Sequence, residues 1–132
     1  MTRDNVDVVR QALDAYGRRD IPALRAINDP EVELDWSASR SWLAGVYRGF
    51  DEALRFYEGY FEAFERIVFE AEGFIDAGES VVVPNVARQW GRDGIEVSAA
   101  STLVFTLRDL KVVRICLYQT TERALEAVGL TG

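Results

Sequence analysis

The main change in the spacing of the apolar residues of this chain falls at residue 67, and that change limits what the chain can fold into. Before that point they recur at the helical steps of three and four residues. Two such stripes are Val6, Val9, Leu13 and Tyr16, and Leu54, Tyr57, Phe61 and Phe64. From Ile67 onward, apolar and polar residues alternate as they do in half-buried strands. The spacing therefore predicts helices first and a sheet afterwards.

Turn and cap residues divide these patterns into elements. Helices are expected over 4–17, 20–28 and 51–64, with Asp4 and Asp51 as N-caps. A short strand is expected over 32–36, a loop over 37–49, longer strands over 67–75, 81–90, 95–107 and 112–119, and a short helix over 122–128. We therefore expect one α+β domain over 1–132. Its curved antiparallel sheet would wrap around the three N-terminal helices and leave an internal pocket for a small apolar molecule.

Composition excludes several classes of function. The net charge of -7 argues against nucleic acid as a partner, because phosphate binding needs a surplus of Lys and Arg. The chain has no histidine, which removes Ser-His-Asp and Cys-His nucleophiles and histidine-ligated metals. Cys116 is the only cysteine, so neither an internal disulfide nor a thiolate metal cluster is expected. We expect no metal and no cofactor, and acid–base chemistry would fall to carboxylates, tyrosines or lysine.

The N-terminus and the hydropathy pattern bear on location. Residues 1–4 lack the basic and then apolar pattern of a signal peptide. No apolar run approaches the length that crosses a bilayer. We therefore expect a cytoplasmic protein with no membrane partner.

Several short segments resemble the SnoaL-like family in their order and spacing. They are DIPAL at 20–24, DPEVE at 29–33, GVYRG at 45–49, FIDAG at 74–78, LRDLKVVR at 107–114 and ALEAVGL at 124–130. That family belongs to the cone-shaped superfamily of nuclear transport factor 2, ketosteroid isomerase, limonene epoxide hydrolase and scytalone dehydratase. The resemblance implies this fold and a homodimer that pairs through the open sheet face. Because the superfamily includes enzymes of several kinds and non-catalytic binding modules, site residues must decide the function.

Asp35 is the first candidate for catalysis. The resemblance places it at the end of the first strand, where ketosteroid isomerases carry the aspartate that moves a proton beside a carbonyl. Burial beside Trp36 would raise its pKa and suit it to act as a general base. The alternative is a strand-end residue that faces solvent or pairs with Arg40 or Arg48. Tyr16 is the second candidate, as a donor that points inward.

The resemblance to the better-known enzymes stops at their other catalytic residues. The tyrosine of ketosteroid isomerases falls near Ala12 in this chain and their second acid near Leu103. The acid of epoxide hydrolases falls at Leu117, beside Tyr118. Both of those specific reactions are therefore disfavoured.

Further residues are expected to line the pocket and contact a ligand. They are Trp36 and Trp42 at its mouth, the helix aromatics Tyr57, Tyr60 and Phe61, the polar residues Asn85, Gln89 and Ser101, and Leu103, Leu117 and Tyr118 on the last two strands. Each has an ordinary alternative, which is core packing, a buried polar network or a dimer contact.

Two hypotheses follow. In the first, the domain binds a small apolar molecule and acts on it as a cofactor-free isomerase or cyclase, with Asp35 as the base. In the second, it is a non-catalytic ligand carrier or a dimeric interaction module. The first requires Asp35 to lie in the cavity with a donor such as Tyr16, Tyr57, Tyr118 or Asn85.

Overall fold

The structure, a computed structural model, describes residues 4–130. Its helices are α1 (Asn5–Gly17), α2 (Ile21–Ile27), α3 (Phe50–Ala63) and α4 (Thr121–Ala127). Its strands are β1 (Asn28–Asp35), β2 (Val46–Arg48), β3 (Arg66–Ala71), β4 (Ile75–Ala77), β5 (Ser80–Trp90), β6 (Glu96–Arg108) and β7 (Lys111–Tyr118). Residues 1–3, on which part of the signal-peptide expectation rests, lie outside this range. No helix in the described range is long and apolar enough to cross a membrane.

Local hydrogen bonds start the helices. Asp4 and Asp7 form a reciprocal capping box at the start of α1, and the Asp20 side chain accepts from the Ala23 N–H at the start of α2. The expected cap of α3 is wrong by two residues, because Gly49 occupies that position at φ 84°. Glycine adopts this backbone conformation without strain. Asp51 lies instead in the first turn of α3, where its negative charge interacts favourably with the helix dipole.

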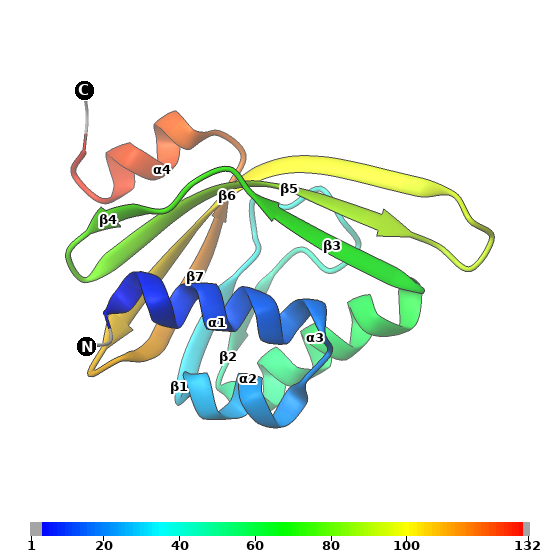
Figure 1. Cartoon of the computed structure of the whole chain (residues 1–132), viewed down its shortest axis with the longest axis horizontal. Helices are drawn as coiled ribbons and strands as arrows, with labels where there is room; N and C mark the ends of the chain where they lie inside the picture. The colour runs from blue at the N-terminus through cyan, green and yellow to red at the C-terminus, as the bar shows by residue number, and fades with distance from the viewer. Residues whose placement is uncertain (1–3, 131–132) are drawn as a thin grey trace.

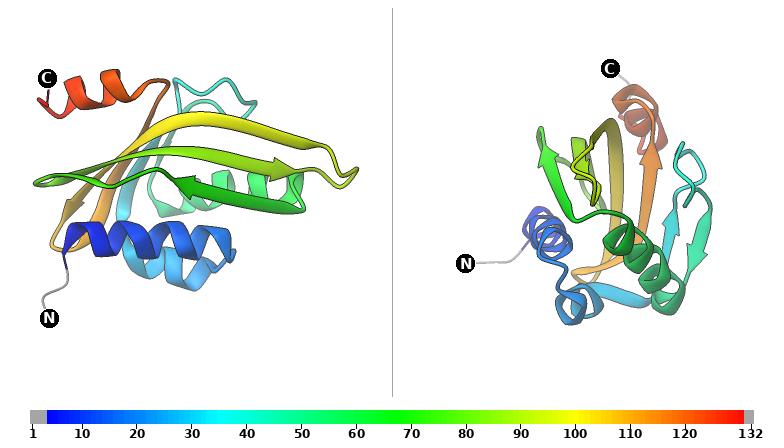
Figure 2. Two further views of the ribbon diagram at one scale, coloured as in Figure 1. Left: turned by 45° about the horizontal axis from the view of Figure 1, so that its top comes forward. Right: turned by 90° about the vertical axis from the view of Figure 1, so that its right-hand side faces the viewer.

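The sheet is long, strongly curved and open, and it confirms the expected α+β class (Figure 1). Its strand order is β2-β1-β7-β6-β5-β3, and β4 pairs with β5. One pairing differs from the expected antiparallel plan, since β1 runs parallel to β7. Between β1 and β7 the chain passes through β2, α3 and the hairpins, and this long connection lets β7 run beside β1 in the same direction. Figure 2 shows α1, α2 and α3 against the concave side of the sheet.

The strand expected over 67–75 is two strands. β3 pairs with β5 as far as Ala71 opposite Asn85, and β4 resumes with Ile75 opposite Val82. Pro84 lies at the break, where Glu72 N–H donates to its carbonyl at 2.8 Å. Because proline has no N–H to return to that edge, the ladder cannot continue past it.

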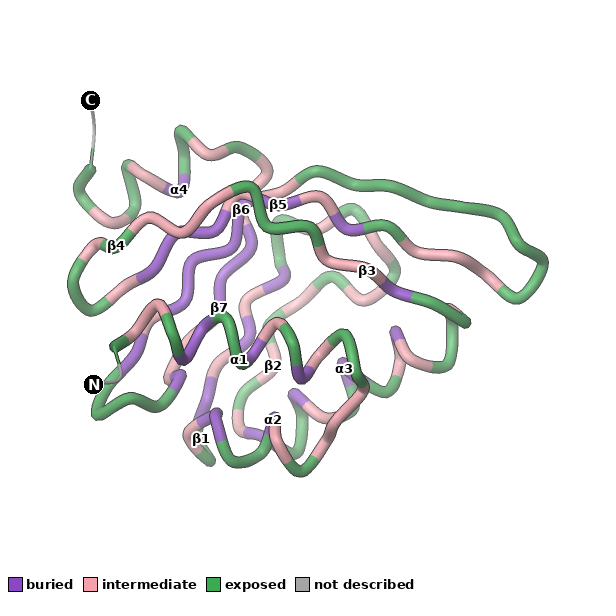
Figure 3. The backbone as a smooth tube through the Cα atoms, in the orientation of Figure 1, coloured by how far each residue is buried: buried purple, intermediate pink, exposed green. Residues whose placement is uncertain are grey.

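The core lies on both faces of the sheet. The larger cluster fills the space between the concave face and the helices, with Val8, Leu24 and Leu34 almost fully buried. The smaller cluster lies on the outer face, where Ala124 of α4 packs against Val82 and Val104. Figure 3 shows buried positions along the middle strands and exposed positions along the start of β6, whereas the end of β5 beside it is mostly half-buried.

Candidate functional site

A cavity of about 620 Å³ lies inside the cone. Its lining comes from α1, α2, α3, five strands and the segment 36–42. At one end the lining is buried and includes Leu34, Tyr57 and Leu103. At the other end Trp42 is 62% exposed and Val97 is 47% exposed. The cavity therefore opens between the loop that carries Trp42 and the first half of β6.

Aromatic rings form much of the cavity wall. Trp36 packs edge-on against Phe56 with ring centroids 4.8 Å apart. Tyr16 and Tyr57 are 5.7 Å apart, and Trp42 and Tyr60 are 5.4 Å apart. Such interlocked rings hold one another in place, so the wall is a preformed apolar surface.

Most of the residues expected in the pocket line the cavity. They are Tyr16, Trp36, Trp42, Tyr57, Tyr60, Gln89, Ser101, Leu103 and Leu117. Of the expected mouth, only Trp42 lies at the opening, because Trp36 is 9% exposed and packs within the wall.

Three expected ligand contacts lie elsewhere. Phe61 packs behind the wall against Tyr16, 5.4 Å between centroids, and does not line the cavity. Asn85 is fully buried. Its Nδ2 donates to the Val83 carbonyl, and its Oδ1 accepts from the Ser101 hydroxyl. Tyr118 packs against the cluster on the outer face, because alternation along β7 sends Leu117 inward and its neighbour outward.

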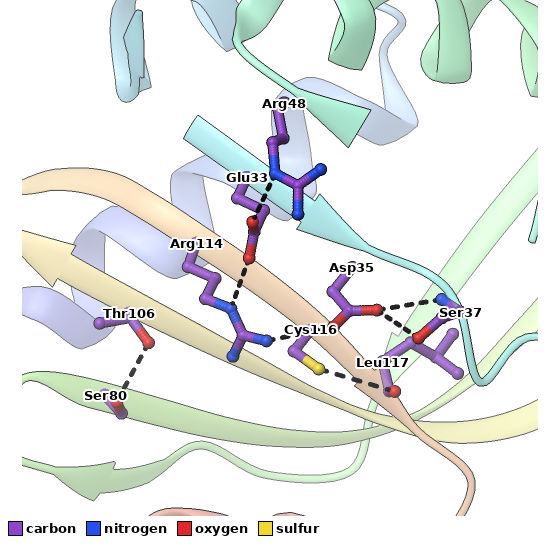
Figure 4. A network of polar contacts seen from close by, with 9 residues as sticks. All are labelled: Glu33, Asp35, Ser37, Arg48, Ser80, Thr106, Arg114, Cys116 and Leu117. Atoms are coloured by element: carbon purple, nitrogen blue, oxygen red, sulfur yellow. Dashed lines mark hydrogen bonds and ion pairs between the residues drawn. The ribbon is translucent and has the colours of Figure 1, made fainter. Parts of the chain in front are cut away.

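The expected position of Asp35 among the buried aromatics is wrong. Val32, Leu34 and Trp36 are buried, so alternation along β1 turns Asp35 to the outer face of the sheet. There its Oδ2 lies 3.1 Å from Arg114 Nη2, and its Oδ1 accepts from the Ser37 hydroxyl at 2.6 Å and the Ser37 N–H at 3.1 Å (Figure 4). Arg114 also pairs with Glu33 at 3.0 Å.

These contacts set the proton affinity of Asp35. Burial alone would raise its pKa, but the hydrogen bonds from Ser37 and the charge of Arg114 outweigh burial and hold the pKa below its ordinary value. Asp35 is therefore a carboxylate at neutral pH. A group of this kind is a weak base, and it lies outside the cavity.

The hydroxyls of two tyrosines in the cavity lining have raised pKa values, in contrast to the lowered pKa of Asp35. Burial raises the pKa of Tyr16 far above its ordinary value, and the nearby Tyr60 and Tyr57 raise it further. Burial also raises the pKa of Tyr57, and the amide of Asn28 opposes that rise. Both tyrosines therefore stay protonated and can donate hydrogen bonds to a ligand.

Two cavity residues were not among the expected ligand contacts. Asn28 was expected only as the last residue of the helix over 20–28, yet it lines the cavity and is 4% exposed. Arg40 was considered only as a partner for Asp35, but it lies in the cavity lining at the exposed end. The sequence did contain a signal that Arg40 lies in the site, namely its position in a loop rich in serine and tryptophan. The place of Asn28 in the cavity lining could be seen only from the three-dimensional packing.

Arg40 is the one charged side chain in the lining formed by residues 4–130. Across the same residues there is no cluster of three His, Cys, Asp or Glu side chains that could hold a metal ion. The arrangement can therefore enclose an apolar molecule, offer it neutral hydrogen-bond donors and place one cation near the opening.

The model of the family described as SnoaL-like domain matches residues 9–115. The chain belongs to this family. A nuclear transport factor 2-like protein of unknown function from Burkholderia pseudomallei has the same fold, with a TM-score of 0.77 and 22% identity over 96% of this chain and 98% of its own. A comparison with curated proteins finds no match.

Two further solved structures carry names with chemical content. TerC, co-crystallised with polyporic acid, has a TM-score of 0.76 and 20% identity over 95% of this chain and 98% of its own. A Jannaschia protein provisionally named a SnoaL-like polyketide cyclase has a TM-score of 0.74 and 20% identity over 100% and 99%. At such identities these likenesses show the shared fold alone.

Proposed function

We propose that this SnoaL-like domain binds a small, largely apolar molecule that contains rings, and that it does so in the internal cavity. The observation that carries the proposal is the cavity itself, about 620 Å³ and walled by aromatic and aliphatic side chains. Ligand sites commonly have volumes of about 300–1,000 Å³ and mostly apolar walls with a few polar groups. TerC, which shares this fold, was co-crystallised with polyporic acid, and this supports the choice of a small organic molecule as the ligand class.

The proposed role is binding without a carboxylate base. No Asp or Glu belongs to the cavity lining in the described part of the chain, and Asp35 is paired on the other face. Proton abstraction by Asp35 from a molecule in the cavity would require the ligand and the carboxylate to meet through the sheet. The ligand carrier is therefore the better of the two hypotheses.

A second candidate function uses the tyrosines. Tyr16 lines the cavity and its hydroxyl has no hydrogen-bond partner within residues 4–130, so this hydroxyl could donate to a ligand carbonyl. Polarising a carbonyl in this way would assist a cofactor-free cyclisation or isomerisation. The name of the Jannaschia protein supports this candidate. It requires turnover that Tyr16→Phe abolishes while ligand affinity falls little.

The binding proposal is tested by titrating the protein with naphthalene and related ring compounds while thermal unfolding is followed. A bound ligand stabilises the folded state, by about 2.7 kcal/mol when its free concentration is a hundred times Kd. Ala87→Phe places a ring in the cavity and is expected to weaken binding at least about tenfold. Val86→Phe, on the opposite face of the same strand, is the matched control and keeps wild-type affinity. Equal affinity in both variants contradicts the proposal.

A further inference from the structure

The inference concerns the open end of the cavity and rests on the proposed binding function. We propose that Arg40 makes this end a subsite for a compact organic anion, such as a carboxylate, on a ligand whose rings lie deeper in the cone. The ligand class is then a ring compound that carries an acidic group and keeps that group at the opening.

Arg40 belongs to the cavity lining and is also accessible to solvent. It is exposed, as is Trp42 two residues further along the chain, and both residues line the cavity. The opposite end, with Leu34 and Leu103, is buried and apolar. An anion at the open end keeps part of its hydration, whereas the same anion at the buried end would lose nearly all of it. The ligand therefore has one favourable orientation, with its rings inside and its charge at the opening.

The Arg40 side chain has no partner of its own among residues 4–130. It takes part in no hydrogen bond, ion pair or ring contact there. The arginines that form ion pairs with carboxylates are Arg18, Arg48, Arg88 and Arg114. Arg55, Arg108 and Arg123 also lack a side-chain partner in the described chain, but they do not line the cavity. Arg40 is therefore the one unpaired cation of the described residues that belongs to the cavity.

The loop that carries Arg40 is held from two sides. The Ser41 hydroxyl lies 2.8 Å from the Tyr60 hydroxyl of α3. Gln119 Nε2, just beyond β7, donates to the Ala38 carbonyl at 2.6 Å. Because the backbone on either side of Arg40 is tied to two walls of the cavity, only the side chain has to be ordered when a ligand binds, which keeps the entropic cost of the contact small.

The charges in and around the cavity favour an anion over other polar groups. No Asp or Glu belongs to the lining in the described chain, so an ammonium group would meet Arg40 without a compensating carboxylate. A planar guanidinium offers parallel N–H groups that match a carboxylate in two hydrogen bonds. The whole chain has a net charge of -7, which disfavours anions in general. A preference for an anionic ligand would therefore have to come from a local cation.

The subsite is tested with 2-naphthoate and 2-naphthamide, which have nearly the same shape but differ in charge, and with naphthalene. Their affinities for the whole chain are measured by fluorescence titration at about pH 7, where the carboxylic acid is ionised. We expect the wild-type protein to bind 2-naphthoate about fivefold or more tightly than 2-naphthamide at low ionic strength. This ratio should shrink as salt is added, because salt screens the charge of Arg40.

Two variants that remove one positive charge each assign the preference. In Arg40→Gln the affinities for 2-naphthoate and 2-naphthamide become similar, and that for naphthalene is unchanged. Arg123→Gln is the matched control, because its exposed, unpaired arginine lies on α4 at the outer face of the sheet. It changes the net charge equally and keeps the wild-type preference.

The outcomes separate the subsite from the binding function. Naphthalene binding without a preference for 2-naphthoate overturns the subsite and leaves the binding function in place. A preference that persists in Arg40→Gln, or that is lost equally in Arg123→Gln, overturns the assignment to Arg40. Failure of all three compounds to bind overturns the proposed function and the subsite with it. The wild-type comparison needs no variant, so it decides the matter even if Arg40→Gln does not fold.

Discussion

Arg114 Nη2 lies 3.1 Å from Asp35 Oδ2, on the face of the sheet that points away from the cavity. The side chain of Asp35 is 21% exposed and that of Arg114 is 39% exposed, so the pair is neither deeply buried nor fully solvated. The same guanidinium reaches Glu33 and thereby ties β1 to β7, the two strands that pair in parallel. The carboxylate that most resembles a catalytic base is thus a structural partner.

Asp35→Asn is expected to leave ligand affinity unchanged, because the side chain lies outside the cavity. The substitution loses an ion pair and weakens the contacts with Ser37, which together contribute about 1 kcal/mol to the free energy of unfolding. Urea unfolding and a naphthalene titration on the same preparations measure both quantities. A tenfold loss of affinity at unchanged stability would return Asp35 to the site.

The difference in stability between wild type and Asp35→Asn should depend on pH. The folded-state pKa of Asp35 lies below its ordinary value of about 3.9, so ionised Asp35 stabilises the folded state above that pH. Its contribution is lost as the pH falls through the folded-state pKa. Urea unfolding at pH 6, 5, 4 and 3 should therefore give a constant difference down to about pH 5 and a shrinking one below about pH 4. A difference that grows toward low pH contradicts the assigned contacts.

Two cavity tyrosines should respond differently to loss of the hydroxyl. The Tyr60 hydroxyl lies 2.8 Å from the Ser41 hydroxyl and ties α3 to the loop at the cavity opening. Tyr60→Phe should lower the free energy of unfolding by about 1 kcal/mol. Tyr16→Phe should change it by less than about 0.5 kcal/mol, because within the described residues that hydroxyl has no partner to lose. Equal losses in urea unfolding would mean that Tyr16 is held by a contact of similar strength.

The homodimer through the open sheet face stays a prediction. α4 covers the outer face over β5 and β6, while Glu33, Asp35 and Arg114 lie on that face along β1 and β7. A second copy would cover this part of the sheet. Sedimentation equilibrium should show a dimer in the micromolar range, and a monomer at every accessible concentration would contradict it.

The sequence predicted the fold better than it predicted which residues line the cavity. The change from helical spacing to alternation yields the helices, the long strands and the concave face on which Leu103 and Gln89 lie. The parallel pairing of β1 with β7 was missed because it depends on the path of the chain between them. The two-strand form of 66–77 was missed although Pro84 signals it.

Strand phase explains the errors at individual residues. Val32, Leu34 and Trp36 alternate with Glu33 and Asp35, so the sequence itself favours an outward Asp35 once the apolar set is assigned to the core. The same reasoning separates Leu117 from Tyr118. Strand phase does not explain the errors at Asn85 and Asn28. Only three-dimensional contacts show which of the two side-chain amides has all its hydrogen-bond partners.

The most direct test of the central claim is to locate a bound ring compound by nuclear magnetic resonance. Intermolecular Overhauser contacts from naphthalene protons should reach Leu24, Leu103 and Ile115 inside the cone. They should disappear in Ala87→Phe and persist in Val86→Phe. Contacts to Val82, Val104 and Leu125 instead would place the ligand on the outer face and contradict a cavity binding site.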